Sequence, residues 1–82
     1  MREEQLLARI TTDANVMVGK PVVRGTRLTV EHILRLLAFG ATHEELLQEY
    51  PALHSEDIHA CLLFAAKTLE DITFMPLEPV PA

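Results

Sequence analysis

The fold is decided by residues 19–30, which read Gly19-Lys20-Pro21-Val22-Val23-Arg24-Gly25-Thr26-Arg27-Leu28-Thr29-Val30. Its two glycines can adopt positive φ without a Cβ penalty, and its proline fixes its own φ, so two tight reversals can flank a short Val-Val strand. A helix is expected directly after Thr29, whose hydroxyl can cap it. The stretch therefore predicts a short β-ribbon that leads into a helix.

The residues before this stretch supply candidate partners for the Val-Val strand. We expect a brief strand around Arg9 to Thr11, followed by a turn that uses the side chains of Asp13 and Asn15. Two pairings remain open, because residues 16–18 and residues 22–23 can each pair with that strand or with one another. We assign the β-ribbon to about residues 9–28, and a ribbon this short needs a surface to lie on, either its own helices or a second copy.

Three helices are expected after the ribbon, at about residues 30–39, 43–50 and 56–72. The first has apolar residues at helical spacing over much of its circumference, which is typical of a helix that is central or shared with a partner chain. Gly40 is a natural residue to follow its end. The sequence therefore predicts a mainly α fold, and we expect a homodimer.

Capping residues define the two later helices. Thr42 and Glu45 have the spacing of a capping box, and Pro51 ends the second helix. Ser55 is the expected N-cap of the third helix. Its buried face is expected to consist of Ile58, Cys61, Leu62, Ala65 and Leu69. A short middle helix, a brief connection and a longest last helix are typical of a helix-turn-helix.

The signature Gly-Lys-Pro-x-x-Arg-Gly-Thr-Arg at residues 19–27 resembles that of the small bacterial domain-of-unknown-function family 433. Residues 36–42 and 49–53 continue the resemblance, which covers roughly residues 9–70. The resemblance implies a homeodomain-like helical fold, which agrees with the three-helix bundle and the preceding N-terminal β-ribbon arm expected from the residues. It also implies an antitoxin of a toxin-antitoxin pair, whose usual partner is a PIN-like ribonuclease.

Charge is distributed unevenly along the 82 residues, which carry a net charge of −5. Residues 1–31 hold five Lys and Arg against four Asp and Glu, whereas residues 32–82 hold two against eight. An unselective nucleic-acid binder would be basic throughout, so a surface that binds anions belongs to the ribbon, and the acidic half favours a basic protein partner.

The ribbon cations Lys20, Arg24 and Arg27 have two open interpretations. They could contact phosphates of operator DNA as a basic arm, or they could pair internally with carboxylates such as Glu31 or Asp13, or across a dimer. In the third helix, His54, Ser55 and His59 are the residues able to reach a base edge. Acidic residues at the start of this helix repel phosphate, so we expect the ribbon to dominate any contact with DNA.

Catalytic and metal sites are not expected. His54, Asp57 and His59 do not share a helical face, and no further ligand completes a zinc spacing. Cys61 lies on the predicted buried stripe without a basic activator, so it is expected to be a core residue. We expect no enzyme activity and no cofactor, because the sequence contains no nucleophile-base pair and no Walker spacing.

The C-terminal segment, residues 73–82, is apolar and rich in proline, and it cannot continue a helix. We therefore divide the chain into a domain of residues 1–72 and an extended tail. The tail residues that suit docking into a groove of a toxin are Phe74, Met75, Leu77 and Val80. The alternative is a terminus that packs back on the helices through Phe74.

The sequence is compatible with two functions. The first is an antitoxin that masks a ribonuclease toxin and represses its own operon through operator DNA. The second is a homodimeric protein-interaction module without a DNA role. The N-terminus does not have the pattern of a secretory signal, one cysteine cannot form an internal disulfide, and no apolar run is long enough to span a membrane. We therefore expect a cytoplasmic protein.

Overall fold

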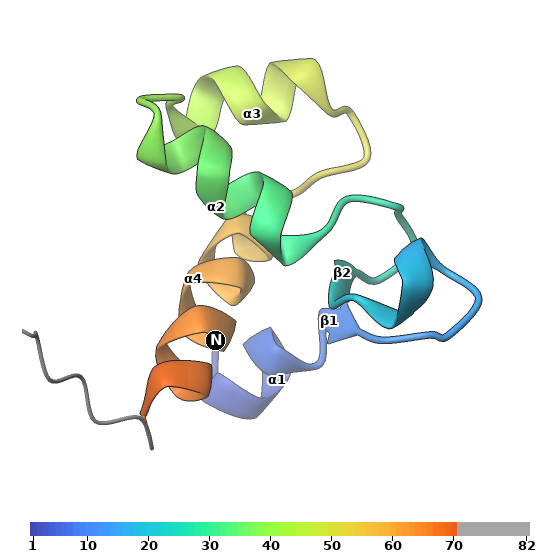
Figure 1. Cartoon of the computed structure of the whole chain (residues 1–82). Helices are drawn as coiled ribbons and strands as arrows, with labels where there is room; N and C mark the ends of the chain where they lie inside the picture. Colours follow the sequence, from blue (N-terminus) through green and yellow to red (C-terminus); the bar gives the residue numbers. More distant parts are fainter. Residues whose placement is uncertain (71–82) are drawn as a thin grey trace, which may run out of the picture.

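The computed structural model describes residues 1–70 and is mainly helical (Figure 1). Within these residues the chain forms four α-helices, one 3₁₀ turn and a two-stranded antiparallel sheet. In chain order the elements are α1 (Glu3–Leu7), β1 (Ile10–Thr11), the 3₁₀ turn (Met17–Gly19), β2 (Val22–Val23), α2 (Val30–Ala38), α3 (His43–Glu49) and α4 (Ser55–Leu69). Three helices were expected, and α1 is an additional one because residues 3–7 form more than a single turn.

The ribbon pairs β1 with β2, in the register Ile10 opposite Val23 and Thr11 opposite Val22. This register decides between the open pairings, because residues 17–19 form the 3₁₀ turn instead of a strand. Both reversals that the glycines predict are present, with φ of +78° at Gly19 and +83° at Gly25. The three strand residues Ile10, Val22 and Val23 are buried, so the ribbon lies on the chain's own helices.

Helix α2 begins and ends as predicted, within one residue. The Thr29 hydroxyl accepts a hydrogen bond of 3.0 Å from the backbone N–H of His32. At the other end Gly40 has a φ of +100°, and its N–H bonds to the Leu37 carbonyl while the N–H of Ala41 bonds to that of Leu36. This pair of hydrogen bonds is a Schellman motif, which explains why glycine follows the helix.

Helix α3 has the predicted capping box. The Thr42 hydroxyl accepts from the backbone N–H of Glu45 at 3.1 Å, and the Glu45 carboxylate accepts from the backbone N–H of Thr42 at 2.9 Å. The hydrogen bonds from Thr42 lower the pKa of the Glu45 carboxyl below its ordinary value. Leu46 is the buried residue of α3. The helix ends at Glu49, one residue earlier than expected.

The start of α4 differs from the prediction. The N-cap residue is His54, and Ser55 is already the first helical residue. The Asp57 carboxylate accepts a hydrogen bond of 2.8 Å from the backbone N–H of His54. Asp57 lies in the first turn of α4, so its side chain caps the helix and no hydroxyl is needed at the N-cap position. The expected last residues, 71 and 72, lie outside the described residues, as does the predicted boundary between domain and tail.

The buried face of α4 is also partly different. Ile58 and Cys61 are buried as predicted, but Leu62 and Leu69 are exposed, and Ala60 is fully buried in their place. The reason is that α4 is contacted by α1, β1, α2 and α3 (Figure 1), so burial follows several neighbours instead of one stripe. The core comprises Ile10, Val22, Val23, Val30, Ile33, Leu46, Leu53, Ile58, Ala60 and Cys61.

Candidate functional site

The cations of the ribbon are held by different parts of the fold. Lys20 Nζ lies 3.0 Å from a carboxylate oxygen of Glu31, and Arg35 lies 3.4 Å from the other oxygen. The hydrogen bond from Lys20, followed by its charge and that of Arg35, lowers the pKa of the Glu31 carboxyl. Lys20 is therefore paired internally with one of the carboxylates that the sequence offered.

Arg24 is also engaged within the chain. Its Nε donates to the carbonyl oxygen of Ala8 at 2.9 Å, and its backbone N–H donates to the carbonyl of Arg9 at 2.7 Å. These bonds join the ribbon to the end of α1. Arg24 lines a hollow of about 420 Å³ that also includes Arg9, His54 and Asp57.

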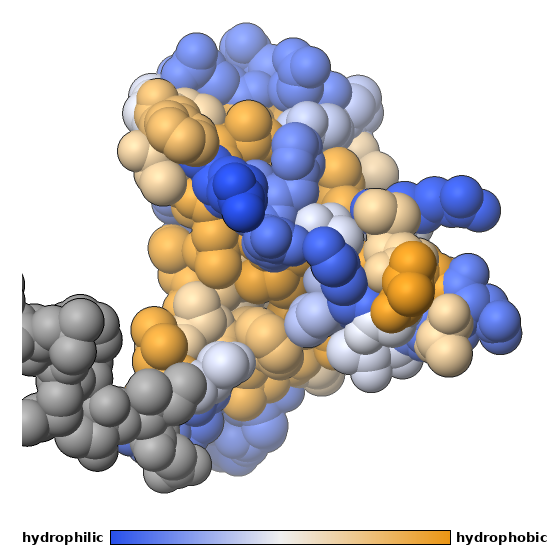
Figure 2. Space-filling model, in the orientation of Figure 1, coloured by the Kyte–Doolittle hydropathy of each residue, from blue (hydrophilic) through white to orange (hydrophobic). Residues whose placement is uncertain are grey.

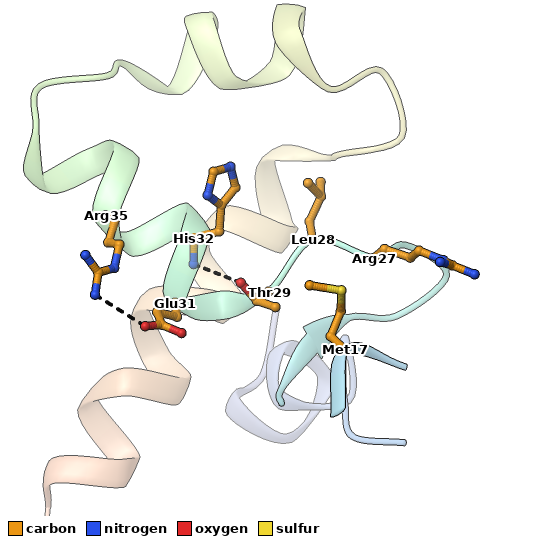
Figure 3. Close-up of a pocket in the computed structure, with 7 residues that line it drawn as sticks. All are labelled: Met17, Arg27, Leu28, Thr29, Glu31, His32 and Arg35. Atoms are coloured by element: carbon orange, nitrogen blue, oxygen red, sulfur yellow. Dashed lines mark hydrogen bonds and ion pairs between the residues drawn. The ribbon is translucent and has the colours of Figure 1, made fainter. Parts of the chain in front are cut away.

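Arg27 lies in a different place from Arg24. It lines a hollow of about 380 Å³ together with Met17, Leu28, Thr29, Glu31, His32 and Arg35. Figure 3 shows that its guanidinium points outward, away from His32 and Arg35. The structure therefore does not bring Lys20, Arg24 and Arg27 together in one site.

The loop beside Arg27 carries a strained backbone that sequence reasoning missed. Met17 and Val18 have φ of +49° and +56°, and Gly19 continues the left-handed run. A β-branched residue rarely adopts positive φ, and Val18 has no compensating burial because it is 93% exposed. No residue type at positions 17 and 18 signals this conformation. The loop therefore presents an apolar side chain to solvent at the tip of the ribbon.

The start of α4 collects the candidate base-contacting residues. His54 and His59 are exposed, and Ser55 is half-buried. The ring centroids of His59 and His43 are 5.8 Å apart, so His59 lies close to the first residue of α3. The acidic residues Glu56 and Asp57 follow within the first turn of α4, at the position from which a recognition helix would read bases.

Arg9 partly compensates the charge of this acidic turn, and the sequence analysis did not identify it. Arg9 Nη1 lies 2.9 Å from Asp57 Oδ1, and Nη2 lies 3.5 Å from Glu56 Oε2. The Asp57 side chain is only 5% exposed, so the ion pair with Arg9 offsets part of the cost of taking this carboxylate out of water. The ion pair holds β1 against α4, and it reduces the negative charge at the helix start without making it basic.

An open apolar groove lies between α2 and α4, and we call it the α2–α4 groove. It has a volume of about 520 Å³ and is lined by Pro21, Val30, Glu31, Leu34, Arg35, Ala38, Phe64, Ala65, Thr68 and Leu69. Figure 2 shows hydrophobic residues over α2 and α4 on this face. At the far end of α2, Phe39 is 87% exposed. The wide apolar stripe predicted for α2 is thus only partly covered by the chain's own core.

Metal ligation and thiol chemistry have little support in the described part of the chain. Residues 1–70 contain no group of three or more His, Cys, Asp or Glu side chains that could hold a metal ion. Cys61 is fully buried, as predicted for a core residue. Burial, followed by the charge of Asp57, raises the pKa of its thiol to about 11. The thiol therefore stays protonated at neutral pH.

Two further expectations concern the membrane and the tail. None of the helices within residues 1–70 has the length and apolar character needed to cross a bilayer. The predicted toxin-binding residues Phe74, Met75, Leu77 and Val80 lie outside the described residues.

Comparisons with known proteins identify a family, a relative and a solved structure that are similar to this chain. Residues 10–65 match the family described as "Protein of unknown function (DUF433)". The uncharacterized protein y4eO of Sinorhizobium fredii is 34% identical over 56 residues, which are 68% of this chain but only a quarter of that protein. The crystal structure of a DUF433 member from Anabaena variabilis is similar with a TM-score of 0.72 and 30% identity, over 84% of this chain and 68% of that one. The family match spans more than half of the residues, and the fold agrees with that of a solved member, so this chain belongs to the DUF433 family.

Proposed function

We propose that this protein is an antitoxin that binds and neutralises a PIN-like ribonuclease toxin in the bacterial cytoplasm. It acts by binding, without a catalytic step of its own. The homeodomain-like unit of α2, α3 and α4 serves as the scaffold, and Phe74, Met75, Leu77 and Val80 form the toxin-binding segment.

This proposal rests on the apolar surface that a very small domain leaves exposed. The α2–α4 groove and the 87% exposed Phe39 leave hydrophobic area uncovered, and such patches mark protein-binding sites. A domain of this size buries only about 60% of the surface of its unfolded chain, so a partner adds stability that the core cannot supply.

Charge supports a nuclease as that partner. The sequence after residue 31 has two basic residues against eight acidic ones, and on α3 the carboxylates of Glu44, Glu45 and Glu49 belong to exposed residues. A nuclease binds RNA through a cationic surface, because most of that affinity comes from phosphate contacts. An acidic and apolar protein can cover such a surface, and neutralisation then follows from occlusion.

The test is coexpression with the product of the reading frame next to the gene. We expect the two proteins to copurify and growth arrest caused by the neighbour to be relieved. An uninhibited, freely toxic neighbour with no copurification would refute the antitoxin function. A variant of the neighbour without its active-site carboxylates serves as the control, because it should still copurify.

A second candidate is a homodimeric interaction module without a DNA role. The pairing of Lys20 with Glu31 and of Arg24 with the Ala8 carbonyl favours it, since these cations already have partners. The double variant Arg24→Ala, Arg27→Ala separates the two candidates. Loss of operator binding with an intact dimer supports autorepression, whereas loss of the dimer supports the second candidate.

A further inference from the structure

A hollow of about 210 Å³ lies between the last turn of α2 and helix α3, and we call it the α2–α3 hollow. Its lining is mostly apolar and consists of Leu36, Ala41, Leu46 and Tyr50, together with Glu45 and Glu49. The hydroxyl of Tyr50 lies 3.0 Å from Nε2 of His32, so a hydrogen bond restrains the aromatic ring. The hollow therefore combines an apolar wall with two carboxylates, which suits a basic side chain with a long aliphatic stem.

The carboxylates of α3 differ from most others in the described part of the chain. The residues whose carboxylates lie within ion-pair distance of a Lys or Arg nitrogen are Glu3, Glu4, Glu31, Glu56, Asp57 and Glu70. Within residues 1–70 no such partner exists for Glu44, Glu45 or Glu49, and α3 itself contains no Lys or Arg. The other exception in this range is Asp13, whose carboxylate accepts the backbone N–H of Asn15. Unpaired negative charge is therefore concentrated on α3, over which Figure 2 shows hydrophilic residues.

Two of these carboxylates are placed unfavourably in the free protein. Glu45 and Glu49 are four residues apart on α3, where side chains are neighbours and like charges repel. Glu49 is also the last residue of the helix, so its charge lies at the negative end of the helix dipole. A cation bound between the two carboxylates reverses both effects. A positively charged partner therefore gains more at this place than at a carboxylate that is already paired.

We propose that the α2–α3 hollow receives an arginine side chain from a basic segment of the toxin, with its guanidinium bound to Glu45 and Glu49. Arginine fits better than lysine because its planar guanidinium can bond two carboxylates and stack on the ring of Tyr50. The capping box uses Oε1 of Glu45, which leaves the other oxygen for the guanidinium. Phe39, the exposed C-cap residue of α2, offers the same segment an apolar contact. This inference rests on the antitoxin function and assigns one point of contact to the toxin's cationic surface.

Charge reversal at Glu49 tests the proposal. We expect Glu49→Lys to raise the dissociation constant of the complex at least about tenfold, because it replaces an attraction with a repulsion in the hollow. Isothermal titration calorimetry measures this with the inactive variant of the neighbouring gene product, which lacks its active-site carboxylates. In the free protein the same substitution removes the repulsion with Glu45, so the melting temperature should rise by about 3 °C. Weaker binding therefore cannot be attributed to unfolding.

Glu4→Lys is the matched control. It makes the same change in net charge at an exposed residue of α1, which lies at the other end of the molecule from α3 (Figure 1). At physiological salt a distant surface charge is largely screened, so the dissociation constant should stay within about twofold of the wild-type value.

Three results would overturn the inference and leave the antitoxin function standing. They are undiminished binding by Glu49→Lys, an equal loss of binding by Glu4→Lys, and a lower melting temperature of Glu49→Lys, which would mean that Glu49 acts through the fold. The absence of any complex between the wild-type protein and the neighbouring gene product would instead refute the antitoxin function, and this inference with it.

Discussion

Arg9 Nη1 lies 2.9 Å from Asp57 Oδ1, and this contact joins residues 48 positions apart. Asp57 also accepts the backbone N–H of His54, so one buried carboxylate both caps α4 and holds the ribbon strand β1 against it. This ion pair therefore helps to hold the ribbon against α4, in addition to the burial of Ile10 and Val23 in the core.

Replacing Arg9 with methionine should lower the free energy of unfolding by about 3 kcal/mol. Removing one partner of a buried ion pair costs about 3–5 kcal/mol, and we expect the lower end because the Arg9 side chain is 30% exposed. Urea denaturation measures the change. Arg2→Met is the control, because Arg2 pairs with Glu4 on the surface at 3.9 Å and should change stability by less than about 0.5 kcal/mol. Equal effects of the two variants would contradict the role of the Arg9–Asp57 pair.

The strained loop predicts that Val18→Asn stabilises the protein. Val18 has a φ of +56° and is almost fully exposed, so the substitution relieves backbone strain without removing packing. Asparagine tolerates this region far better than valine, and we expect a gain of about 1 kcal/mol. Thermal unfolding measures it, with Thr12→Asn as the control at an exposed residue of ordinary φ. A loss of stability in Val18→Asn would indicate that the loop is not left-handed.

The pairing of Glu31 predicts a specific dependence of stability on pH. Lys20 holds the pKa of Glu31 below its ordinary value of 4.5, so the folded state favours the ionised form. This contribution is complete above the unfolded pKa and disappears as pH falls below 4.5 through the lowered pKa. Wild type and Glu31→Gln should therefore differ in unfolding free energy at pH 7, and the difference should shrink as the pH falls below 4.5. A constant difference between pH 7 and pH 3 would argue against the pairing.

The burial of Cys61 predicts slow reaction with thiol reagents. Its pKa rises from 9.0 to about 11, which lowers the thiolate fraction about 100-fold at pH 8, and burial slows access further. Labelling with a disulfide reagent should thus be at least about 100-fold slower in the native protein than in guanidinium chloride. Comparable rates in both conditions would show that α4 opens readily around Cys61.

Local signals in the sequence predicted the helices well. Thr29, Thr42 and Gly40 act on backbone groups within a few residues of themselves, so their capping roles follow from residue type and spacing alone. The short strands at residues 10–11 and 22–23 were found in the same way, because their neighbours are turn residues.

Long-range and unfavourable features were not predicted. The Arg9–Asp57 pair depends on how the ribbon lies on α4, and no spacing in the sequence expresses that. The N-cap of α4 is His54 instead of the predicted Ser55, and the Asp57 carboxylate accepts the backbone N–H of His54 there. The left-handed Met17 and Val18 contradict local preference and exist only because the surrounding loop imposes them. For Lys20 and Arg24 the sequence left both phosphate contact and internal pairing open, and the fold gives each of them a different internal partner.

Inhibition of the neighbouring gene product tests the central claim most directly. RNA cleavage by that product should fall as this protein is added and should stop near one equivalent per toxin. The variant with Phe74→Glu and Leu77→Glu should need at least about tenfold more protein, since losing two apolar anchors costs more than 1.4 kcal/mol. Undiminished RNA cleavage in the presence of excess wild-type protein would contradict the account.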